Sequence, residues 1–509
     1  MHVLEQNFNT LLELAARQET SPAVHSAKVR PGDAFVALPP SMEGGKGGLD
    51  FVPEALSRRA RFLVCAPDQT AEIEHMLKIA DMPHSPEIIP VPDCRAALGE
   101  LAAARFASRP EIGLLCGITG TNGKTSCAFL LEHLFTQAGY KVGVIGTVNY
   151  RWPGASRPAA LTTPGCLELH ELIGAMKSAG ADTAFMEVSS HALAQNRVAG
   201  LHFHGALWTN LSQDHLDFHP DMEDYHHCKA RLFYGPAQGG PPPEHKARAV
   251  NADDPYGLRL LRACAALPGR TIAYGLEDKK LPVPLLHGEI LSLTPQGLHL
   301  RQHFQGQSWE LRSPLVGRFN AMNLMGAQAM ALALGLEARH LPALEGFTGV
   351  PGRLERIANN RELHVFVDYA HTPDALEKAI KALRDAGFKR IITVFGCGGN
   401  RDRSKRPLMG RTVSGLSDVA VLTSDNPRLE DPQAIIQDVL PGMRGKAETH
   451  VQADRRAATV LALSLARSGD ALLVAGKGHE DYMIIGADKI HYSDQETLRE
   501  LLGTRNGEL

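Results

Sequence analysis

A glycine-rich stretch, GITGTNGKTS at residues 117–126, has the residue types of a phosphate-binding loop. A strict GxxxxGK[ST] pattern would need glycine at position 118, where this chain has Ile118. The physical requirements are still present, because an apolar run ends at Ile118, and Gly120 and Gly123 allow backbone amides to turn toward an anion. The stretch therefore predicts a nucleotide-phosphate cradle of modified shape.

The residues that follow these glycines carry a charge and a hydroxyl. A helix is expected to begin near Lys124, since apolar residues recur after it at helical spacing and Gly139 is placed to end the helix. Lys124 would then reach the terminal phosphates, and the hydroxyl of Thr125 would ligate magnesium. The alternative is a glycine-rich turn with a solvated lysine, but a strand before the turn and a helix after it favour the phosphate loop.

An acid, two histidines and a second lysine follow at the ends of later apolar runs. Glu187 ends the run TAFMEV, where Mg²⁺ would need a further oxygen ligand. His215 and His219 are spaced by four and could be zinc ligands on a helix, but no cysteine or glutamate at matching spacing completes a tetrahedral set. Lys229, taken alone, is typical of a surface lysine on an amphipathic helix.

The elements that must position these residues form one recurring arrangement. From about residue 110 onward, a short β-rich run is followed by small polar residues and then by a helical pattern, which is typical of βα units in a parallel sheet. The fold class predicted is therefore α/β. The runs are IGLLCGI, KVGVIGTV, TAFMEV, GALWTNL, HVFVDYA, IITVFGCG, VAVLTS and ALLVAGKG.

Composition limits the class of protein. The 509 residues suggest about three domains of about 150 residues each. A formal net charge of -3, with 21% charged residues, gives no basic excess for nucleic acid and no acidic excess for disorder, so small-molecule partners are expected. Residues 236–247, rich in Pro and Gly, are expected to be an exposed insertion.

The sequence also predicts the compartment. No run of about 18 apolar residues occurs, so no membrane span is expected, and the N-terminal stretch lacks the continuous apolar run of a signal peptide. Eight scattered cysteines without CxxC pairs do not form a disulfide framework. A cytoplasmic protein is expected.

Nine blocks together resemble the Mur ligases over residues of about 20 to 485. They are GITGTNGKTS, MEVSSHAL, WTNLSQDHLDFH, YHHCKARLF, GRFNAMN, VPGRLERI, VDYAHTPDAL, GCGGNRDRSKRP and GKGHEDYM, in that order. The resemblance implies three domains: a UDP-substrate-binding domain at 1–100, a central P-loop-type, parallel-sheet ATP-binding domain at 101–345, and a C-terminal, Rossmann-like amino-acid-binding domain at 346–509. A monomer is expected.

The resemblance implies an ATP-dependent acid–amino-acid ligase that takes part in peptidoglycan synthesis. A carboxylate is a poor electrophile, and transfer of the ATP γ-phosphate to it creates an acyl phosphate that an amine can attack. Lys124, Lys229 and His215 are the implied catalytic residues. Thr125, Glu187, His215 and Lys229, the last as a CO₂-derived carbamate, are the implied Mg²⁺ ligands.

The resemblance also implies two groups of binding residues. The implied ATP contacts are Gly120, Thr121, Asn122, Gly123, Lys124, Thr125, Ser126, Asn320, Asn323, Arg353, Asp368 and His371, although Arg353 could instead form an interdomain salt bridge. The implied contacts of the UDP-muramoyl dipeptide are Ser26, Thr162, Thr163, Ser190 and Arg197.

The amino acid that is added is predicted from the motif DNPR at residues 425–428. The resemblance associates this motif with the branch that joins meso-2,6-diaminopimelate to UDP-N-acetylmuramoyl-L-alanyl-D-glutamate. Diaminopimelate has one carboxylate more than lysine, and a guanidinium binds a carboxylate through a planar two-point contact. Lysine would leave a buried arginine unpaired, at a cost of about 3 kcal/mol. The implied contacts are Arg401, Asp425, Asn426, Pro427, Arg428, Gly476 and Glu480.

Other functions remain as alternatives. Within the same class they are the L-lysine-adding homologue and another ATP-dependent amide ligase such as a folylpolyglutamate synthase. A simple kinase or P-loop ATPase switch would not require both a carboxylate and an amine for phosphate release. An inactive scaffold is disfavoured by the intact set of charged and hydroxyl residues.

Overall fold

The computed structural model describes residues 2–40, 44–80, 85–109, 112–234 and 246–503. The chain divides into two compact units. The first comprises Met1–Tyr274, Leu281–Pro284 and Gly326–His340, and the second comprises Gly275–Lys280, Leu285–Met325 and Leu341–Leu509. The predicted insertion at 236–247 falls mostly outside the described residues.

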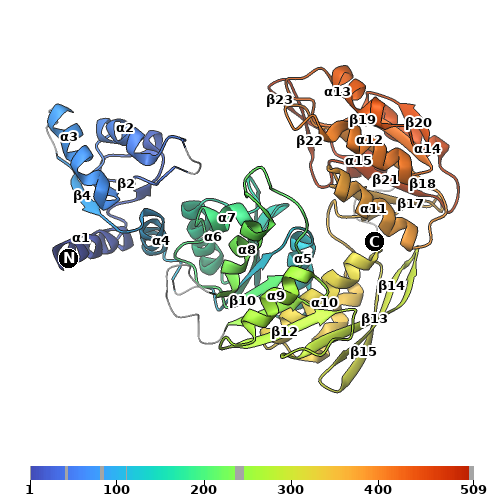
Figure 1. Cartoon of the computed structure of the whole chain (residues 1–509), viewed down its shortest axis with the longest axis horizontal. Helices are drawn as coiled ribbons and strands as arrows, with labels where there is room; N and C mark the ends of the chain where they lie inside the picture. The colour runs from blue at the N-terminus through green and yellow to red at the C-terminus, as the bar shows by residue number, and fades with distance from the viewer. Residues whose placement is uncertain (1, 41–43, 81–84, 110–111, 235–245, 504–509) are drawn as a thin grey trace. The chain divides into compact units, whose positions relative to one another are not determined.

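A four-stranded sheet lies in the first hundred residues of the first unit (Figure 1). Its strands are all parallel in the order β1-β2-β3-β4. Helices α1 and α4 supply apolar residues to one face of the sheet, and α2 and α3 supply them to the other. The elements are α1 (His2–Ala16), β1 (Pro22–Ala23), β2 (Ala34–Val36), α2 (Val52–Ser57), β3 (Phe62–Cys65), α3 (Thr70–Ala80), β4 (Glu87–Pro90) and α4 (Cys94–Arg105).

The larger sheet of the first unit has the order β12-β11-β10-β5-β9-β6-β7-β8. Pairing is parallel from β12 to β6 and antiparallel in the β6-β7-β8 meander. The strands are β5 (Leu114–Thr119), β6 (Val142–Ile145), β7 (Asn149–Trp152), β8 (Ala155–Pro158), β9 (Thr183–Glu187), β10 (Gly205–Trp208), β11 (Ala247–Asn251) and β12 (Arg270–Gly275). The helices between them are α5 (Lys124–Gln137), α6 (Cys166–Ser178), α7 (Ser190–Ala194), α8 (Met222–Tyr234) and α9 (Pro255–Cys264).

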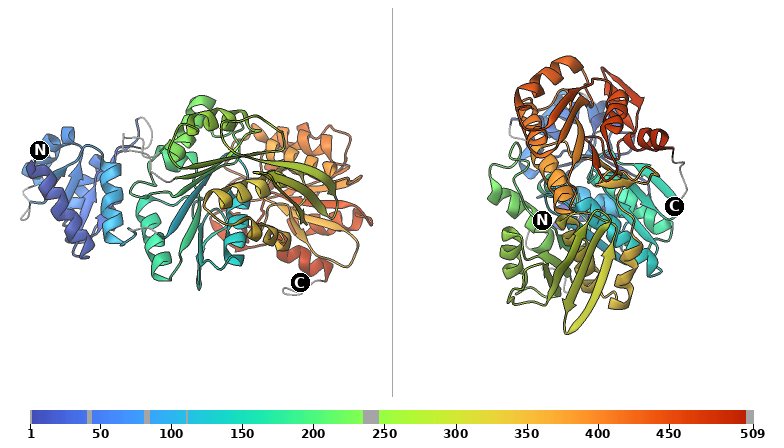
Figure 2. Two further views of the ribbon diagram at one scale, coloured as in Figure 1. Left: turned by 90° about the horizontal axis from the view of Figure 1, so that it is seen from below. Right: turned by 90° about the vertical axis from the view of Figure 1, so that its right-hand side faces the viewer.

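The second unit contains three long antiparallel strands (Figure 2). They are β13 (Leu285–Thr294), β14 (Gly297–Phe304) and β15 (Gln307–Ser313). Helix α10 (Arg318–Ala333) belongs in part to each unit.

The six-stranded sheet of the second unit has the order β16-β17-β21-β18-β19-β20. All pairs are parallel except β16 with β17. Successive residues of a strand face opposite sides, so Phe366 packs toward α11, α12 and α13 while Val365 and Val367 pack toward α14 and α15. The strands are β16 (Glu355–Ile357), β17 (His364–Asp368), β18 (Ile391–Cys397), β19 (Val419–Ser424), β20 (Glu448–Val451) and β21 (Ala471–Ala475).

Helices cover both faces of this sheet, and a hairpin follows it. The helices are α11 (Pro373–Asp385), α12 (Lys405–Leu416), α13 (Pro432–Val439), α14 (Arg455–Leu465) and α15 (Asp494–Leu502). The hairpin is β22 (Tyr482–Ile485) with β23 (Asp488–His491).

The predicted α/β class is confirmed, and each of the eight apolar runs forms a strand. The central parallel sheet carries the glycine-rich turn, and the C-terminal sheet is Rossmann-like. The division at 1–100, 101–345 and 346–509 stays a prediction. No helix among the described residues is both long and apolar enough to cross a bilayer. All eight cysteines are free and buried.

Candidate active site

The glycine-rich turn between β5 and α5 has a fixed shape. Gly120 has φ +145° and Gly123 has φ +86°, values that L side chains rarely adopt. A Cβ on Gly120 would lie 1.9 Å from the hydroxyl oxygen of Thr209. That hydroxyl donates to the carbonyl oxygen of Asn122 at 2.6 Å, and the Asn122 N–H donates to the Asn210 side chain at 3.0 Å. The backbone amides of the turn are therefore preorganised by residues that follow β10.

Two lysines converge on one carbonyl of this turn. Lys124 and Lys229 donate from Nζ to the Gly120 oxygen at 2.9 Å and 3.0 Å. Lys229 is only 1% exposed, so the surface-lysine alternative is wrong. Burial, and next the Lys124 ammonium, lower the pKa of Lys229 well below its ordinary value. The Tyr225 ring lies 4.7 Å from the same Nζ.

A buried carboxylate lies beside the first turn of α5. Glu187, at the end of β9, is 1% exposed and accepts the Thr125 hydroxyl at 3.0 Å. The same carboxylate accepts the N–H of Thr147 at 2.8 Å and its hydroxyl at 3.0 Å. A Cβ on Gly146 would lie 2.3 Å from Glu187 Oε1, so glycine is needed at that position. A carboxylate with hydroxyl neighbours is the hard-oxygen donor set that Mg²⁺ prefers.

His215 lies in a group of histidines and not in a zinc pair with His219. Its ring centroid is 4.9 Å from that of His191, a residue that the sequence did not single out. His219 Nδ1 instead contacts the Asp224 carboxylate at 2.6 Å. Burial, opposed by Asp214 and reinforced by the nearby lysines, lowers the pKa of His215. The ring is therefore neutral near pH 7, which is the form that binds metals.

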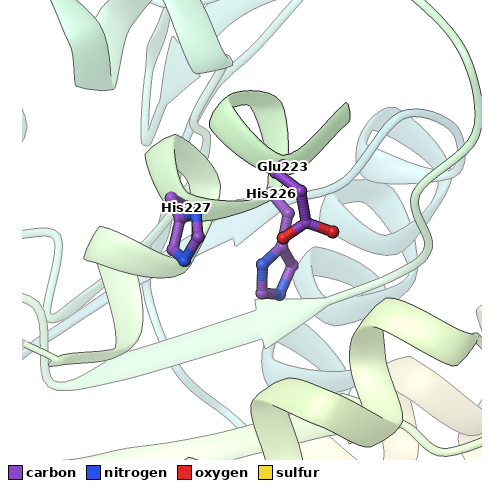
Figure 3. A group of neighbouring side chains, drawn as sticks. All are labelled: Glu223, His226 and His227. Carbon is purple, nitrogen blue, oxygen red and sulfur yellow. The ribbon is translucent and has the colours of Figure 1, made fainter. Parts of the chain in front are cut away.

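Helix α8 carries a separate group of three possible ligands, Glu223, His226 and His227 (Figure 3). Their ligand atoms lie within 4.8 Å of one another. The Glu223 carboxylate, however, already accepts the Arg259 guanidinium at 2.6 Å, and that positive charge opposes a cation. The His226 ring is buried with its centroid 5.5 Å from that of Trp208. We assign no metal to this group.

Residues predicted to bind the UDP-substrate surround the Glu187 end of β9. The Thr162 hydroxyl is 3.1 Å from that of Thr147, and the Thr163 hydroxyl donates to the Glu187 carbonyl at 2.8 Å. Arg197 donates to the Thr163 carbonyl at 2.9 Å. Thr163 thus contacts Glu187 directly, whereas Thr162 and Arg197 are linked to it through Thr147 and Thr163.

Two further residues predicted for that substrate have different surroundings. The Ser190 hydroxyl is buried at the start of α7 and has no hydrogen-bond partner in the described part of the chain. An unpartnered buried hydroxyl can accept or donate to a ligand. Ser26 belongs to the N-terminal sheet region, where its hydroxyl donates to Glu54 at 2.6 Å.

In the second unit, the residues predicted to contact ATP form two local groups. Arg353 places its guanidinium carbon 4.8 Å from the Tyr369 ring centre, and its positive charge opposes the effect of burial on the pKa of Asp368. Asp368 accepts the N–H groups of Leu354 at 2.7 Å and Ala370 at 2.8 Å. These bonds give the Asp368 carboxylate a structural role in shaping this turn, and burial raises its pKa.

His371 and two asparagines complete these groups. His371 Nδ1 contacts the Tyr369 carbonyl at 2.8 Å and the ring is exposed. On α10, Asn320 donates to the Val316 carbonyl at 2.9 Å and accepts Asn323 at 3.2 Å. The two asparagines are buried and their amide orientations are tied together.

The DNPR motif follows β19. Arg428 has φ +53°, and its guanidinium donates to the Gly399 carbonyl at 2.9 Å. No carboxylate of the described residues pairs with Arg428, so the guanidinium has free donors for an anion. A Cβ on Gly399 would lie 1.9 Å from the Pro427 carbonyl. The two loops can approach this closely because residue 399 has no side chain. Arg401, beside this loop, is exposed.

The remaining residues of the predicted amino-acid site surround a lysine that the sequence did not identify. Lys477 is 0% exposed and lies 3.6 Å from the Asp425 carboxylate and 3.7 Å from that of Glu480. Gly476 has φ +118°, and a Cβ there would lie 2.5 Å from Asp425 Oδ2. Asn426 donates to Glu480 at 3.0 Å. The signal in the sequence is a charged residue two positions after the apolar run that forms β21.

Comparison with known proteins agrees with this arrangement. The Mur ligase middle domain matches residues 118–331, and the Mur ligase glutamate ligase domain matches residues 352–478. The chain belongs to the Mur ligase family and is an ATP-dependent ligase.

Two relatives of this chain are named for the same ligase activity. UDP-N-acetylmuramoyl-L-alanyl-D-glutamate–2,6-diaminopimelate ligase of Lawsonia intracellularis (strain PHE/MN1-00) is 50% identical over 94% of this chain and 95% of its own length. The same ligase of Gloeobacter violaceus (strain ATCC 29082 / PCC 7421) is 44% identical, covering 94% of this chain and 93% of that protein. A solved structure of a ligase of this name has a TM-score of 0.68 and 29% identity, covering 95% of this chain and 94% of that chain.

Proposed function

We propose that this chain joins meso-2,6-diaminopimelate to UDP-N-acetylmuramoyl-L-alanyl-D-glutamate with hydrolysis of ATP, as a step of peptidoglycan synthesis. The identity of the added amino acid is inferred from Arg428. Its guanidinium is partly buried and has no carboxylate partner in the described structure. Diaminopimelate carries the extra carboxylate that such a group would pair with. The L-lysine-adding reaction would leave it unpaired.

The reaction proceeds through two transfers. A carboxylate oxygen of the muramoyl dipeptide forms a bond to the γ-phosphorus of ATP, and the bond to the bridging oxygen breaks to release ADP. The diaminopimelate amine then attacks the acyl carbon, and inorganic phosphate leaves. Lys124 at the glycine-rich turn would neutralise the phosphate charge that develops.

Magnesium, when bound, would neutralise phosphate charge and orient the transferring group. Thr125, Glu187 and His215 would supply oxygen and neutral imidazole donors for it, and Lys229 would be a further ligand once it has formed a carbamate. The fit rests on the buried Lys229 amine, whose lowered pKa favours the neutral form that attacks CO₂. A carbamate would also remove the repulsion between this amine and Lys124.

The remaining contacts follow from family resemblance and are part of the proposal. Gly120, Thr121, Asn122, Gly123 and Ser126 would bind the phosphates of ATP through the turn. The other nucleotide contacts would be Asn320, Asn323, Arg353, Asp368 and His371, and the UDP-substrate contacts would be Ser26, Thr162, Thr163, Ser190 and Arg197. We also propose a cytoplasmic monomer with the three domains given above.

One experiment tests the proposal. Phosphate release is measured with ATP, Mg²⁺ and the UDP-muramoyl dipeptide, and with diaminopimelate, lysine or no amine. We expect turnover with diaminopimelate and at least about 100-fold lower kcat/KM with lysine. Equal turnover with lysine would contradict the role of Arg428, and release without any amine would contradict the ligase reaction.

A further inference from the structure

The amino-acid site of the second unit contains a lysine whose charge is entirely removed from solvent. Lys477 follows β21, and its side chain is 0% exposed. A buried ammonium is unfavourable unless partners replace its water. It donates to the Asn426 side-chain oxygen at 3.1 Å and to the Tyr482 carbonyl at 2.7 Å. Both of these hydrogen bonds therefore go to protein groups and not to solvent.

Two carboxylates surround the same ammonium. Asp425 Oδ1 lies 3.6 Å and Glu480 Oε2 lies 3.7 Å from Lys477 Nζ. Without this positive charge, Asp425 and Glu480 would repel each other in a poorly solvated pocket. Burial lowers the pKa of Lys477 and the nearby Asp425 opposes that shift, so the ion pair favours the charged lysine.

The lysine also determines which way the Asn426 amide faces. Asn426 Oδ1 accepts both Lys477 Nζ at 3.1 Å and the Ile484 N–H at 3.0 Å. With its oxygen fixed by two donors, the Asn426 amide nitrogen is left to donate to Glu480 at 3.0 Å. The orientation of Glu480 therefore depends on Lys477 through a direct contact and through Asn426.

The same contacts join the DNPR turn to the β22-β23 hairpin. Ile484, held by Asn426, accepts the N–H of Arg428 at 3.0 Å, and the Gly486 N–H donates to the Arg428 carbonyl at 2.7 Å. Arg428 has a positive φ, which costs free energy unless surrounding bonds hold it. Lys477 lies at the junction of the two segments that hold this arginine.

We infer that Lys477 is a positioning residue that holds Asn426, Glu480 and Arg428 in the arrangement that binds the incoming diamino acid. This inference rests on the proposed function and deepens it, because it concerns the same site. Lys477 does not itself reach the substrate, since its side chain is enclosed by its protein partners. Its removal should therefore weaken recognition of one substrate and leave the other two unchanged.

The test compares Lys477→Met with Lys489→Met. Methionine keeps the length of the side chain and removes its charge. Lys489 is an exposed lysine on the same hairpin that lies 3.7 Å from the Tyr482 ring centre, which makes it a matched control. We expect Lys477→Met to raise KM for diaminopimelate about 30-fold or more, whereas KM for ATP and for the UDP-dipeptide changes less than about threefold. Lys489→Met should resemble the wild type.

Two further variants separate positioning from general stability. Lys477→Gln, which keeps a donor for Asn426, should raise KM for diaminopimelate by less than Lys477→Met does, and Lys477→Arg should recover part of the loss. A parallel rise in all three KM values would overturn the inference, and so would a KM for diaminopimelate within threefold of the wild type. If Lys477→Met does not fold, the same criteria apply to Lys477→Gln.

The amino acid that the wild type uses tests the proposed function separately from the positioning role of Lys477. Wild-type protein that turns over lysine instead of diaminopimelate would contradict the proposed function. The Lys477 comparison would then be made with lysine as the acceptor. A selective effect on that KM would still support the positioning role, and an equal effect on all substrates would overturn it.

Discussion

Two buried lysines, one in each unit, have opposite surroundings. Lys229 contacts a backbone carbonyl next to another lysine, whereas Lys477 lies between Asp425 and Glu480. Burial lowers the pKa of both, and a carboxylate opposes the shift in each case: Asp214 for Lys229, and Asp425 and Glu480 for Lys477. Among the described residues, however, carboxylates lie at ion-pair distance only from Lys477. A buried amine without a counter-charge is available for chemistry, while one with counter-charges organises its neighbours.

The same contrast extends to the two candidate sites. The glycine-rich turn presents backbone amides and the Lys124 ammonium to an anion, and Glu187 is held separately by Thr125 and Thr147. In the DNPR site, Asp425 and Glu480 are balanced by Lys477, and Arg428 has no carboxylate partner within the described structure. The first arrangement suits a polyphosphate, and the second suits a zwitterion with one additional carboxylate.

The largest effect is expected from removing Lys229. Lys229→Ala should lower kcat about 1000-fold, because it deletes a predicted carbamate that would bind the metal. Short carboxylic acids should restore part of the activity by supplying the missing oxygens. Phosphate release, measured with and without bicarbonate, tests this expectation. Full activity of Lys229→Ala, together with an unmodified intact mass of the wild type, would contradict it.

The second prediction concerns the amino-acid site and tests whether Arg428 selects diaminopimelate over lysine. Arg428→Lys keeps the charge but loses the planar two-point contact, so kcat/KM for diaminopimelate should fall about 100-fold while kcat/KM for lysine changes little. Arg456→Lys is a control, because Arg456 forms an exposed pair with Glu500 in the same unit. An unchanged preference for diaminopimelate in Arg428→Lys would exclude the arginine as the selectivity determinant.

Replacing Gly146 tests how tightly the Glu187 carboxylate is held. Gly146→Ala places a methyl group 2.3 Å from Glu187 Oε1 and should displace the carboxylate from Thr125 and Thr147. The unfolding free energy should fall by about 1–3 kcal/mol, and the Mg²⁺ concentration needed for activity should rise. Chemical denaturation and a magnesium titration measure the two effects. Gly165→Ala, with open space around its Cβ, should leave both unchanged.

The smallest effect is expected from a surface acid near the DNPR turn. Hydrogen bonds from Arg406 and from the Asn400 N–H lower the pKa of Glu430 from 4.5 to about 2. Because folding lowers this pKa, the stabilisation is complete above pH 4.5 and is lost as the pH falls through about 2. The melting temperatures of the wild type and Glu430→Gln should differ at pH 6 and converge toward pH 2. A difference that does not depend on pH would contradict this assignment.

Local pattern was sufficient to predict the elements and the loop. The run IGLLCGI forms β5, the helix expected near Lys124 begins there, and Gly139 with φ +94° follows its end. These features depend on neighbouring residues, because strand alternation, helical spacing and positive φ are properties of short segments. The resemblance to Mur ligases added the family, which the comparisons confirm.

Contacts between distant segments were not predictable in the same way. Thr209 and Asn210 fix the glycine-rich turn from about 90 positions away, Thr147 holds Glu187, and His191 packs on His215. No spacing rule links such residues, since the sheet order that brings them together is set by packing of the whole unit. The contact between His219 and the Asp224 carboxylate likewise joins residues that no spacing rule singled out.

The sequence by itself determined the α/β elements, the phosphate loop and the family of this protein. Only the tertiary structure decided that Lys229 is buried with no described carboxylate at ion-pair distance, and that Lys477 is buried with two. The two lysines are chemically identical and each lies near apolar residues along the chain. Their protonation and role depend on which distant side chains replace water around the amine, and that is fixed only when the sheets and helices pack.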